Sequence, residues 1–132
     1  MVRIARAVFH GMLDHAKEEW PTECCGLLAG RDGIATRIYP LENQDKSRTS
    51  YLAAPEQEAE ALREIEDLGL DLLAVYHSHP DTESYPSSVD VEKRFFGEVL
   101  CLIISLRDRT CRVGAFRIAG RGEIIEERIE IL

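Results

Sequence analysis

Apolar positions near the start of the chain recur at steps of three and four residues, the spacing of one face of a helix. This stripe consists of Ala5, Val8, Phe9, Met12, Leu13, Ala16 and Trp20. Pro21 follows it directly, and proline cannot continue a helix because it lacks the amide hydrogen and its ring clashes with the preceding turn. The pattern predicts a first helix that ends before Pro21, with the stripe in the core and with His10 and His15 as solvated histidines.

The next apolar run is short and bounded by glycine, which favours a buried strand over a helix. It covers residues 24–30, and residues 34–39 have the pattern of a second strand. Between them lies Arg31-Asp32-Gly33, in which Asp-Gly is typical of a tight turn. A β-hairpin is therefore expected here.

The second half of the chain alternates between helix and strand patterns. Pro55 opens an acidic segment that ends near Gly69 and is predicted to be an amphipathic helix. Its apolar face consists of Ala61, Leu62, Ile65 and Leu68. Further predicted elements are a buried strand at 72–76, a short helix from Ser87 or Ser88 to about Phe96, and strands at 100–106, 111–118 and 124–131. This order indicates an α/β (α+β) fold with one mixed sheet flanked by helices.

Composition limits what the chain binds. Its 132 residues fit one domain, residues 1–132. The 24 acidic residues outnumber the 16 lysines and arginines, which gives a formal net charge of -8 and a pI of about 5.0. This charge repels nucleic-acid phosphates and anionic lipids, and the apolar runs are too short to cross a bilayer. We expect neither nucleic acid nor a membrane as a partner.

The first twenty residues lack the apolar block of a secretion signal, because charged residues and histidines interrupt them. The four cysteines, Cys24, Cys25, Cys101 and Cys111, contain no Cys-x-x-C pair. A chain of this length can form a core without disulfide bonds. Reduced thiols and a cytoplasmic location are therefore expected.

The residues with the clearest chemistry follow the strand at 72–76. Side chains two apart on a strand share a face, so His77 and His79 can direct both imidazoles to one point at the end of the strand. If Ser87 caps the next helix, Asp90 lies on its first turn and can enter the same space. Two histidines, one aspartate and one open position form the usual arrangement of a catalytic zinc site.

Each part of this pattern also has a simpler interpretation. His-x-His occurs on many strands without a metal, and Ser-x-x-Asp is an ordinary capping box at a helix start. Asp81 and Glu83, in the intervening loop, are competing candidates for a ligand. The combination favours a metal site, because Pro80 stops the strand and a short polar loop returns an acid to it.

Hydrolysis at such a site needs a proton carrier and a group that stabilises the oxyanion. Zinc lowers the pKa of bound water towards ~7. Glu23 lies between the first helix and a buried strand and is the candidate general base, although it could instead be an exposed acid after Pro21. Ser87 is the candidate oxyanion donor, although it could act only as a helix cap.

These residues resemble the JAMM (MPN+) metalloprotease family. The similar segments are Pro21-Thr22-Glu23-Cys24-Cys25-Gly26-Leu27-Leu28, His77-Ser78-His79-Pro80 and Pro86-Ser87-Ser88-Val89-Asp90. The resemblance implies zinc ligation by His77, His79 and Asp90, with Glu23 close to the metal as general base and Ser87 supporting the oxyanion. It also implies the JAMM/MPN fold, a curved mixed β-sheet flanked by helices, which is cytidine-deaminase-like.

The resemblance further implies the reaction. Members of this family cleave peptide or isopeptide bonds after the C-terminal Gly-Gly of ubiquitin or ubiquitin-like proteins. The short chain resembles the compact prokaryotic type, for which the implied substrate is a ubiquitin-like sulfur-carrier protein. Two alternatives are a non-catalytic MPN-type interaction module and a metal-dependent phosphoesterase. The sequence leaves open which modifier is cleaved and the oligomeric state.

Overall fold

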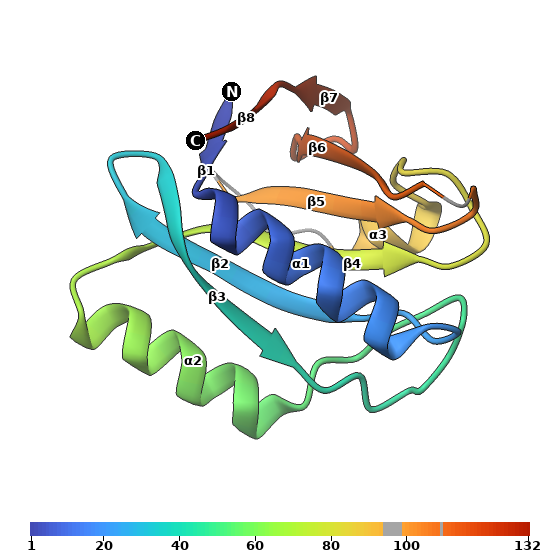
Figure 1. The fold of residues 1–132 in the computed structure, drawn as a ribbon, viewed down its shortest axis with the longest axis horizontal. Helices are drawn as coiled ribbons and strands as arrows, with labels where there is room; N and C mark the ends of the chain where they lie inside the picture. Colours follow the sequence, from blue (N-terminus) through green and yellow to red (C-terminus); the bar gives the residue numbers. More distant parts are fainter. Residues whose placement is uncertain (94–98, 109) are drawn as a thin grey trace.

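The computed structural model of the chain describes residues 1–93, 99–108 and 110–132. These residues form three helices and eight strands (Figure 1). Their bounds are β1 (Val2–Ile4), α1 (Arg6–Glu19), β2 (Cys25–Arg31), β3 (Ile34–Leu41), α2 (Pro55–Asp67), β4 (Asp71–His79), α3 (Ser88–Glu92), β5 (Leu100–Ser105), β6 (Arg112–Ile118), β7 (Ile124–Glu127) and β8 (Ile129–Ile131). α3 ends at Glu92 with Lys93 as its C-cap, earlier than the predicted end at about Phe96, and residues 94–98 lie outside the described ranges.

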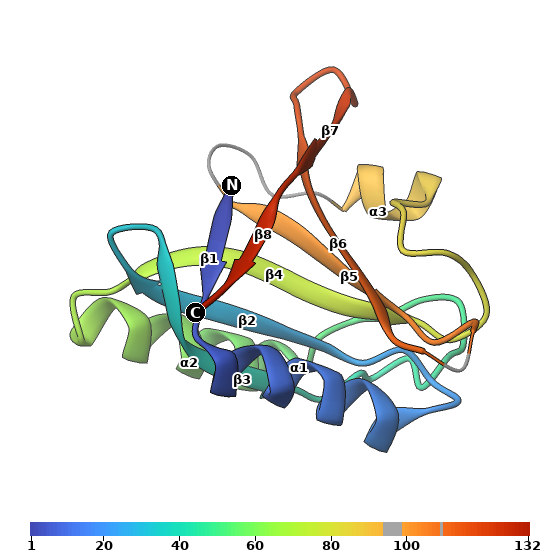
Figure 2. The ribbon, with the colours of Figure 1, turned by 45° about the horizontal axis from the view of Figure 1, so that its top comes forward.

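The described strands form one mixed sheet in the order β7-β6-β5-β4-β2-β3-β1-β8. The predicted hairpin is β2 and β3, which are antiparallel, whereas the central pair of β4 and β5 is parallel. The sheet curves strongly, so that β6 and β7 turn away from the plane of β2 (Figure 2). The predicted α/β fold, a curved mixed sheet flanked by helices, is confirmed.

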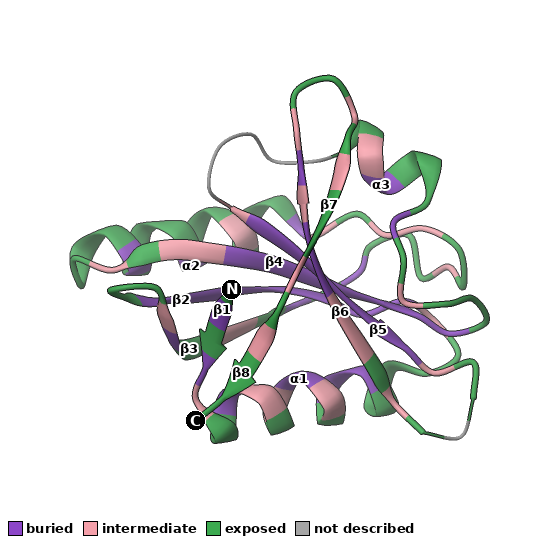
Figure 3. Ribbon diagram, turned by 90° about the horizontal axis from the view of Figure 1, so that it is seen from above, coloured by how far each residue is buried: buried purple, intermediate pink, exposed green. Residues whose placement is uncertain are grey.

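Helices cover both faces of this sheet, with α1 on one side and α2 and α3 on the other (Figure 3). Side chains of the strands alternate between two sets of contacts, as the two-residue period of a strand requires. Met12 of α1 packs in one cluster with Leu28 and Tyr76, whereas Ile65 of α2 packs in another with Val75. None of the described helices has the length and apolar character needed to span a membrane.

The two ends of the chain differ from the sequence prediction. Val2–Ile4 forms β1, which the sequence analysis missed because three residues are too few to display a period. The segment predicted as one strand at 124–131 is two strands, β7 paired with β6 and β8 paired with β1. The chain changes partners at Arg128, between β7 and β8, and hydrophobic periodicity does not report such a change.

Several helix positions also differ. Trp20, predicted in the core, is 55% exposed, because α1 ends before it. Its ring lies under the Arg48 guanidinium. His15, predicted to be solvated, is buried, and its Nδ1 lies 2.7 Å from the Tyr76 hydroxyl. On α2, Leu62 and Leu68 are exposed, and only the other two predicted core positions are buried.

Candidate metal centre

His77 and His79 occupy the last positions of β4, which runs between β2 and β5. They share the strand face of Val75, so both imidazoles lie on the side of the sheet that α2 and α3 cover. The two histidines are 1% and 5% exposed. Buried imidazoles need polar partners, and each of these finds one in the other and in Asp90.

The polar atoms of His77, His79 and Asp90 form a compact triangle. The two Nε2 atoms are 3.2 Å apart, Asp90 Oδ1 is 3.1 Å from Nε2 of His77, and Asp90 Oδ2 is 3.1 Å from Nε2 of His79. Ligands bound at ~2.0–2.1 Å in a tetrahedral zinc site lie about 3.3 Å from one another. The donor set therefore has the size that a zinc ion requires.

The His79 ring is oriented by a backbone carbonyl. Its Nδ1 lies 2.8 Å from the Glu83 carbonyl oxygen, which can only accept, so Nδ1 carries the hydrogen. A neutral His79 then presents a lone pair at Nε2 towards the Asp90 carboxylate. These two groups repel each other unless a proton or a cation lies between them, and carbonyl-oriented histidines of this kind are typical of metal sites.

Asp90 lies beside the two imidazoles because it is on the first turn of α3. Ser87 caps the helix: its Oγ accepts from the Asp90 amide at 3.2 Å, and its own amide donates to Asp90 Oδ2 at 2.8 Å. The predicted capping box is therefore present, and it leaves the carboxylate turned towards the two imidazoles. Ser87 itself is exposed.

The other two acids of the intervening loop lie elsewhere. Asp81 is exposed and pairs with Arg48, whose Nε and Nη2 atoms lie 2.9 and 2.8 Å from its carboxylate oxygens. Glu83 contributes its carbonyl to His79, and the residue itself is exposed. Among the described residues, the metal-ligating atoms that all lie within 4.8 Å of one another belong to Glu23, His77 and His79, and neither Glu83 nor Asp90 is in this group.

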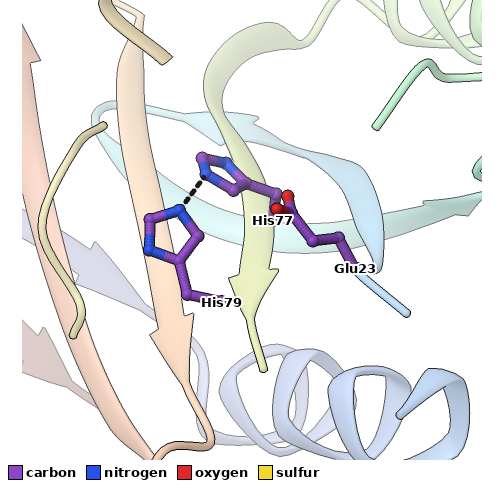
Figure 4. A group of neighbouring side chains, drawn as sticks. All are labelled: Glu23, His77 and His79. Atoms are coloured by element: carbon purple, nitrogen blue, oxygen red, sulfur yellow. Dashed lines mark hydrogen bonds between the residues drawn. The ribbon is translucent and has the colours of Figure 1, made fainter. Parts of the chain in front are cut away.

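Glu23 lies just before β2, the strand next to β4. β2 and β4 are antiparallel with Cys25 opposite His77, and continuing this register brings Glu23 opposite His79. Backbone and side chain of Ser78 both bond Cys24, which fixes this continuation. One Glu23 oxygen and one nitrogen of each histidine lie within 4.8 Å of one another (Figure 4).

Glu23 is removed from solvent. The residue is 4% exposed, and Oε1 has no hydrogen-bond partner among the residues that the structure describes. Burial raises the pKa of Glu23 to about 8, a shift that nearby His79 and Lys93 oppose and Asp90 reinforces. A carboxylic acid whose pKa lies near neutrality can both accept and release a proton.

The remaining three groups titrate differently. Burial would raise the pKa of Asp90, but hydrogen bonds with His77 and His79 hold it well below its ordinary value. Burial lowers the pKa of His77, and the nearby Asp90 opposes this only in part. Burial lowers the pKa of His79 as well, but its hydrogen bonds to Asp90 and to the Glu83 carbonyl together outweigh burial, so the pKa is raised.

Tyr51 and Lys93, which the sequence analysis did not single out, border the same site. The Tyr51 ring stacks on His77 with centroids 4.9 Å apart, and Lys93 Nζ donates to the Tyr51 carbonyl at 2.5 Å. Both line a small cavity beside His77 and Asp90. An aromatic residue at the end of a turn-rich segment carries no signal of this role in the sequence.

The cysteines near the site are packing residues. Cys24, Cys25 and Cys101 are buried free thiols, and burial raises the pKa of each to about 12. A thiol with so high a pKa stays protonated and unreactive at neutral pH.

The chain is similar to one protein family and to two proteins that are named as a peptidase and a probable protease. A family model of prokaryotic homologs of the JAB domain matches residues 5–117. The chain is 31% identical over 135 residues to the CysO-cysteine peptidase of Mycobacterium tuberculosis, covering 99% of this chain and 92% of the relative. It is 40% identical over 91 residues to the probable TtuB-protein conjugate cleaving protease of Thermus thermophilus, covering 68% and 61%.

Solved structures are similar over the whole chain. Protein DSY2949 from Desulfitobacterium hafniense has a TM-score of 0.88 at 34% identity, covering 100% of this chain and 93% of that one. A structure described as "JAMM: A Metalloprotease-like Zinc Site in the Proteasome and Signalosome" has a TM-score of 0.62 at 19% identity, covering 100% and 98%. The second likeness concerns the fold alone.

Proposed function

This chain belongs to the prokaryotic homologs of the JAB domain, and we propose that it is a zinc-dependent peptidase. It is a hydrolytic enzyme of the JAMM type. The proposed cleavage site is the bond after the C-terminal Gly-Gly of a ubiquitin-like carrier protein. In this proposal residues 1–132 form one catalytic domain. The observation that carries it is the pair of buried carboxylates beside two imidazoles: Asp90 is bonded to both rings, and Oε1 of Glu23 has no hydrogen-bond partner among the described residues.

His77, His79 and Asp90 are the proposed ligands of a single zinc ion. The size of their triangle and the Nδ1 hydrogen bond of His79 support this assignment, and the low pKa of Asp90 keeps the carboxylate ionised. When bound, zinc supplies Lewis-acid polarisation of a carbonyl and lowers the pKa of water.

Glu23 is the proposed general base and acid. A carboxylate oxygen of Glu23 takes a proton from the attacking water and delivers it to the leaving nitrogen. Its position within 4.8 Å of the imidazole nitrogens and its burial beside them support both steps. General acid-base catalysis of this kind contributes ~10²- to 10⁴-fold to a rate.

Ser87 is the proposed donor to the oxyanion. Its Oγ accepts from the Asp90 amide, which leaves the hydroxyl hydrogen available to a substrate oxygen. The residue is exposed beside Asp90, so a substrate carbonyl can approach it from solvent. A donor fixed by a helix cap does not have to reorganise as charge develops.

The proposed substrate class follows from the relatives. One relative is named a CysO-cysteine peptidase and the other a probable TtuB-protein conjugate cleaving protease. Glycine suits the residue before the cleaved bond, since only glycine lets a backbone enter a narrow site without a side-chain clash. An extended tail can also bind by strand addition.

Incubation with an extended carrier tests this function. The substrate is a ubiquitin-like carrier protein whose Gly-Gly is followed by a short peptide, and mass spectrometry identifies the products. We expect a carrier product that ends at Gly-Gly, and no product from a matched substrate with Ala-Ala in that place. Cleavage elsewhere, equal cleavage of both substrates, or no cleavage by the zinc-loaded protein would contradict the proposal.

A further inference from the structure

We propose that Asn43 is a positioning residue. Its side chain fixes the backbone of Glu23 and the backbone on both sides of Tyr51, and so holds both residues beside the histidine pair. The inference rests on the proposed function, because it assigns Asn43 a part in that reaction. Asn43 lies just after β3, is 7% exposed and is the only asparagine in the sequence.

The position of the Glu23 carboxylate depends on its backbone. Among the described residues, Oε1 of this carboxylate has no hydrogen-bond partner. Glu23 also lies outside any helix or strand, in the segment between α1 and β2. Its amide donates to the Ser47 carbonyl at 2.8 Å, and its carbonyl accepts from Asn43 Nδ2 at 3.0 Å.

The side chain of Asn43 uses both ends of its amide. Nδ2 donates to the carbonyl of Glu23 and, at 3.1 Å, to that of Ser50. Oδ1 accepts from the amides of Asp45 and Leu52, both at 3.0 Å. Two donor hydrogens and two acceptor lone pairs are the full capacity of a primary amide. No other residue type of this size offers the same four bonds.

Two of these bonds bracket Tyr51. Asn43 contacts the carbonyl of Ser50 and the amide of Leu52, the residues on either side of it. The Tyr51 ring stacks on His77 at 4.9 Å with an interplanar angle of 27°. One amide therefore connects the segment that carries the proposed base to the segment that packs on a proposed ligand. Loss of its donors frees the Glu23 carbonyl without touching any ligand.

Replacement of the amide by an isosteric carboxylate tests this role. Asn43→Asp keeps both acceptor bonds and removes both donors, and Gln44→Glu makes the same chemical change at the exposed neighbouring position. With the extended carrier as substrate, we expect Asn43→Asp to lower kcat by ~10²-fold, with KM and bound zinc close to wild type, since small displacements of catalytic groups cost about that much. Gln44→Glu should behave as wild type.

Several outcomes would overturn the proposal. An unchanged kcat would show that Asn43 does not position the base. A loss of zinc in parallel with activity, or an increase in KM alone, would show a structural or binding role instead. If wild type itself cleaves no carrier, the proposed function fails, and the role of Asn43 is decided by the next measurement.

Hydrogen exchange in the wild-type protein is independent of activity and of the folding of any variant. Asn43 Oδ1 accepts from the amides of Asp45 and Leu52, so both should exchange slowly although they lie in a surface segment. In a folded Asn43→Ala protein both should exchange faster, while the Val75 amide in β4 is unchanged. Fast exchange of both amides in wild type would overturn the proposal.

Discussion

Asp90 reaches His77 and His79 from the first turn of α3, whereas Glu23 reaches them from the irregular segment before β2. Asp90 is bonded to both imidazoles and to the Ser87 amide, and these bonds hold its pKa well below its ordinary value. Glu23 is equally buried but lacks such partners among the described residues, and its pKa is raised to about 8.

This difference supports the separate functions that we propose for the two carboxylates beside the histidine pair. The acid whose charge is compensated stays ionised and suits a ligand, whereas the acid without such hydrogen bonds has a raised pKa and suits proton transfer. Local hydrogen bonding, rather than the identity of the side chain, separates the two.

Removal of zinc should have the largest effect on activity, because Asp90 then has no ion to bind and Glu23 has no zinc-activated water to deprotonate. Treatment with a chelator should reduce cleavage of the extended carrier to background, and added zinc should restore it. Chelated protein that is verified to be metal-free and retains its rate would contradict the zinc assignment.

Glu23→Gln should lower kcat by ~10²- to 10⁴-fold, because the amide cannot accept or deliver a proton. Steady-state kinetics on the zinc-loaded variant measure the effect. Glu18→Gln, at an exposed position of α1, makes the same change away from the site and should leave the rate unchanged. A Glu23→Gln rate within a few-fold of wild type would contradict the role of general base.

Ser87→Ala tests the residue that caps the helix of Asp90, since it removes both the helix cap and the proposed oxyanion donor. We expect kcat to fall by ~10²-fold, in the range of other oxyanion donors. Thermal unfolding should report the loss of the cap as about 1 kcal/mol.

Two variants separate these effects. Ser87→Thr keeps a hydroxyl and should recover most of the rate, whereas Ser88→Ala, at an exposed position, should change little. Equal rates for Ser87→Ala and wild type would restrict Ser87 to capping.

The smallest expected effect concerns the pH dependence of stability without metal. The pKa of Glu23 rises from an ordinary 4.5 to about 8, so the folded state binds its proton more tightly than the unfolded state does. Its contribution to the free energy of unfolding therefore falls as the pH rises between those two values.

Glu23→Gln removes this contribution. In chelator, urea unfolding at pH 8 should find the variant more stable than wild type by on the order of 1–3 kcal/mol, with a smaller difference at pH 5. An equal difference at both pH values would contradict the raised pKa.

The sequence predicted most of this site because its signals are local. His77 and His79 share a face through the period of a strand, and Ser87 and Asp90 share a helix turn, so spacing alone brought each pair together. The resemblance to the JAMM family, confirmed by the match over residues 5–117, supplied the proximity of Glu23 to the histidines. That proximity arises from the register of β2 against β4, which one chain does not report.

Other features depend on contacts between distant segments. Asn43 and Tyr51 lie in a polar, turn-rich stretch that reads as an ordinary loop, and their contacts with Glu23 and His77 form only after the sheet is assembled. The short strand β1 and the break between β7 and β8 depend on pairing between the two ends of the chain. The cytoplasmic location stays a prediction.

Zinc content of two matched variants tests the division of roles most directly. Glu23→Gln and Asp90→Asn make the same carboxylate-to-amide change on the two sides of the histidine pair, and metal analysis of the purified proteins measures bound zinc. We predict about one zinc ion per chain in Glu23→Gln and little in Asp90→Asn, with activity lost in both. Zinc lost from Glu23→Gln but retained by Asp90→Asn would contradict the assignment of base and ligand.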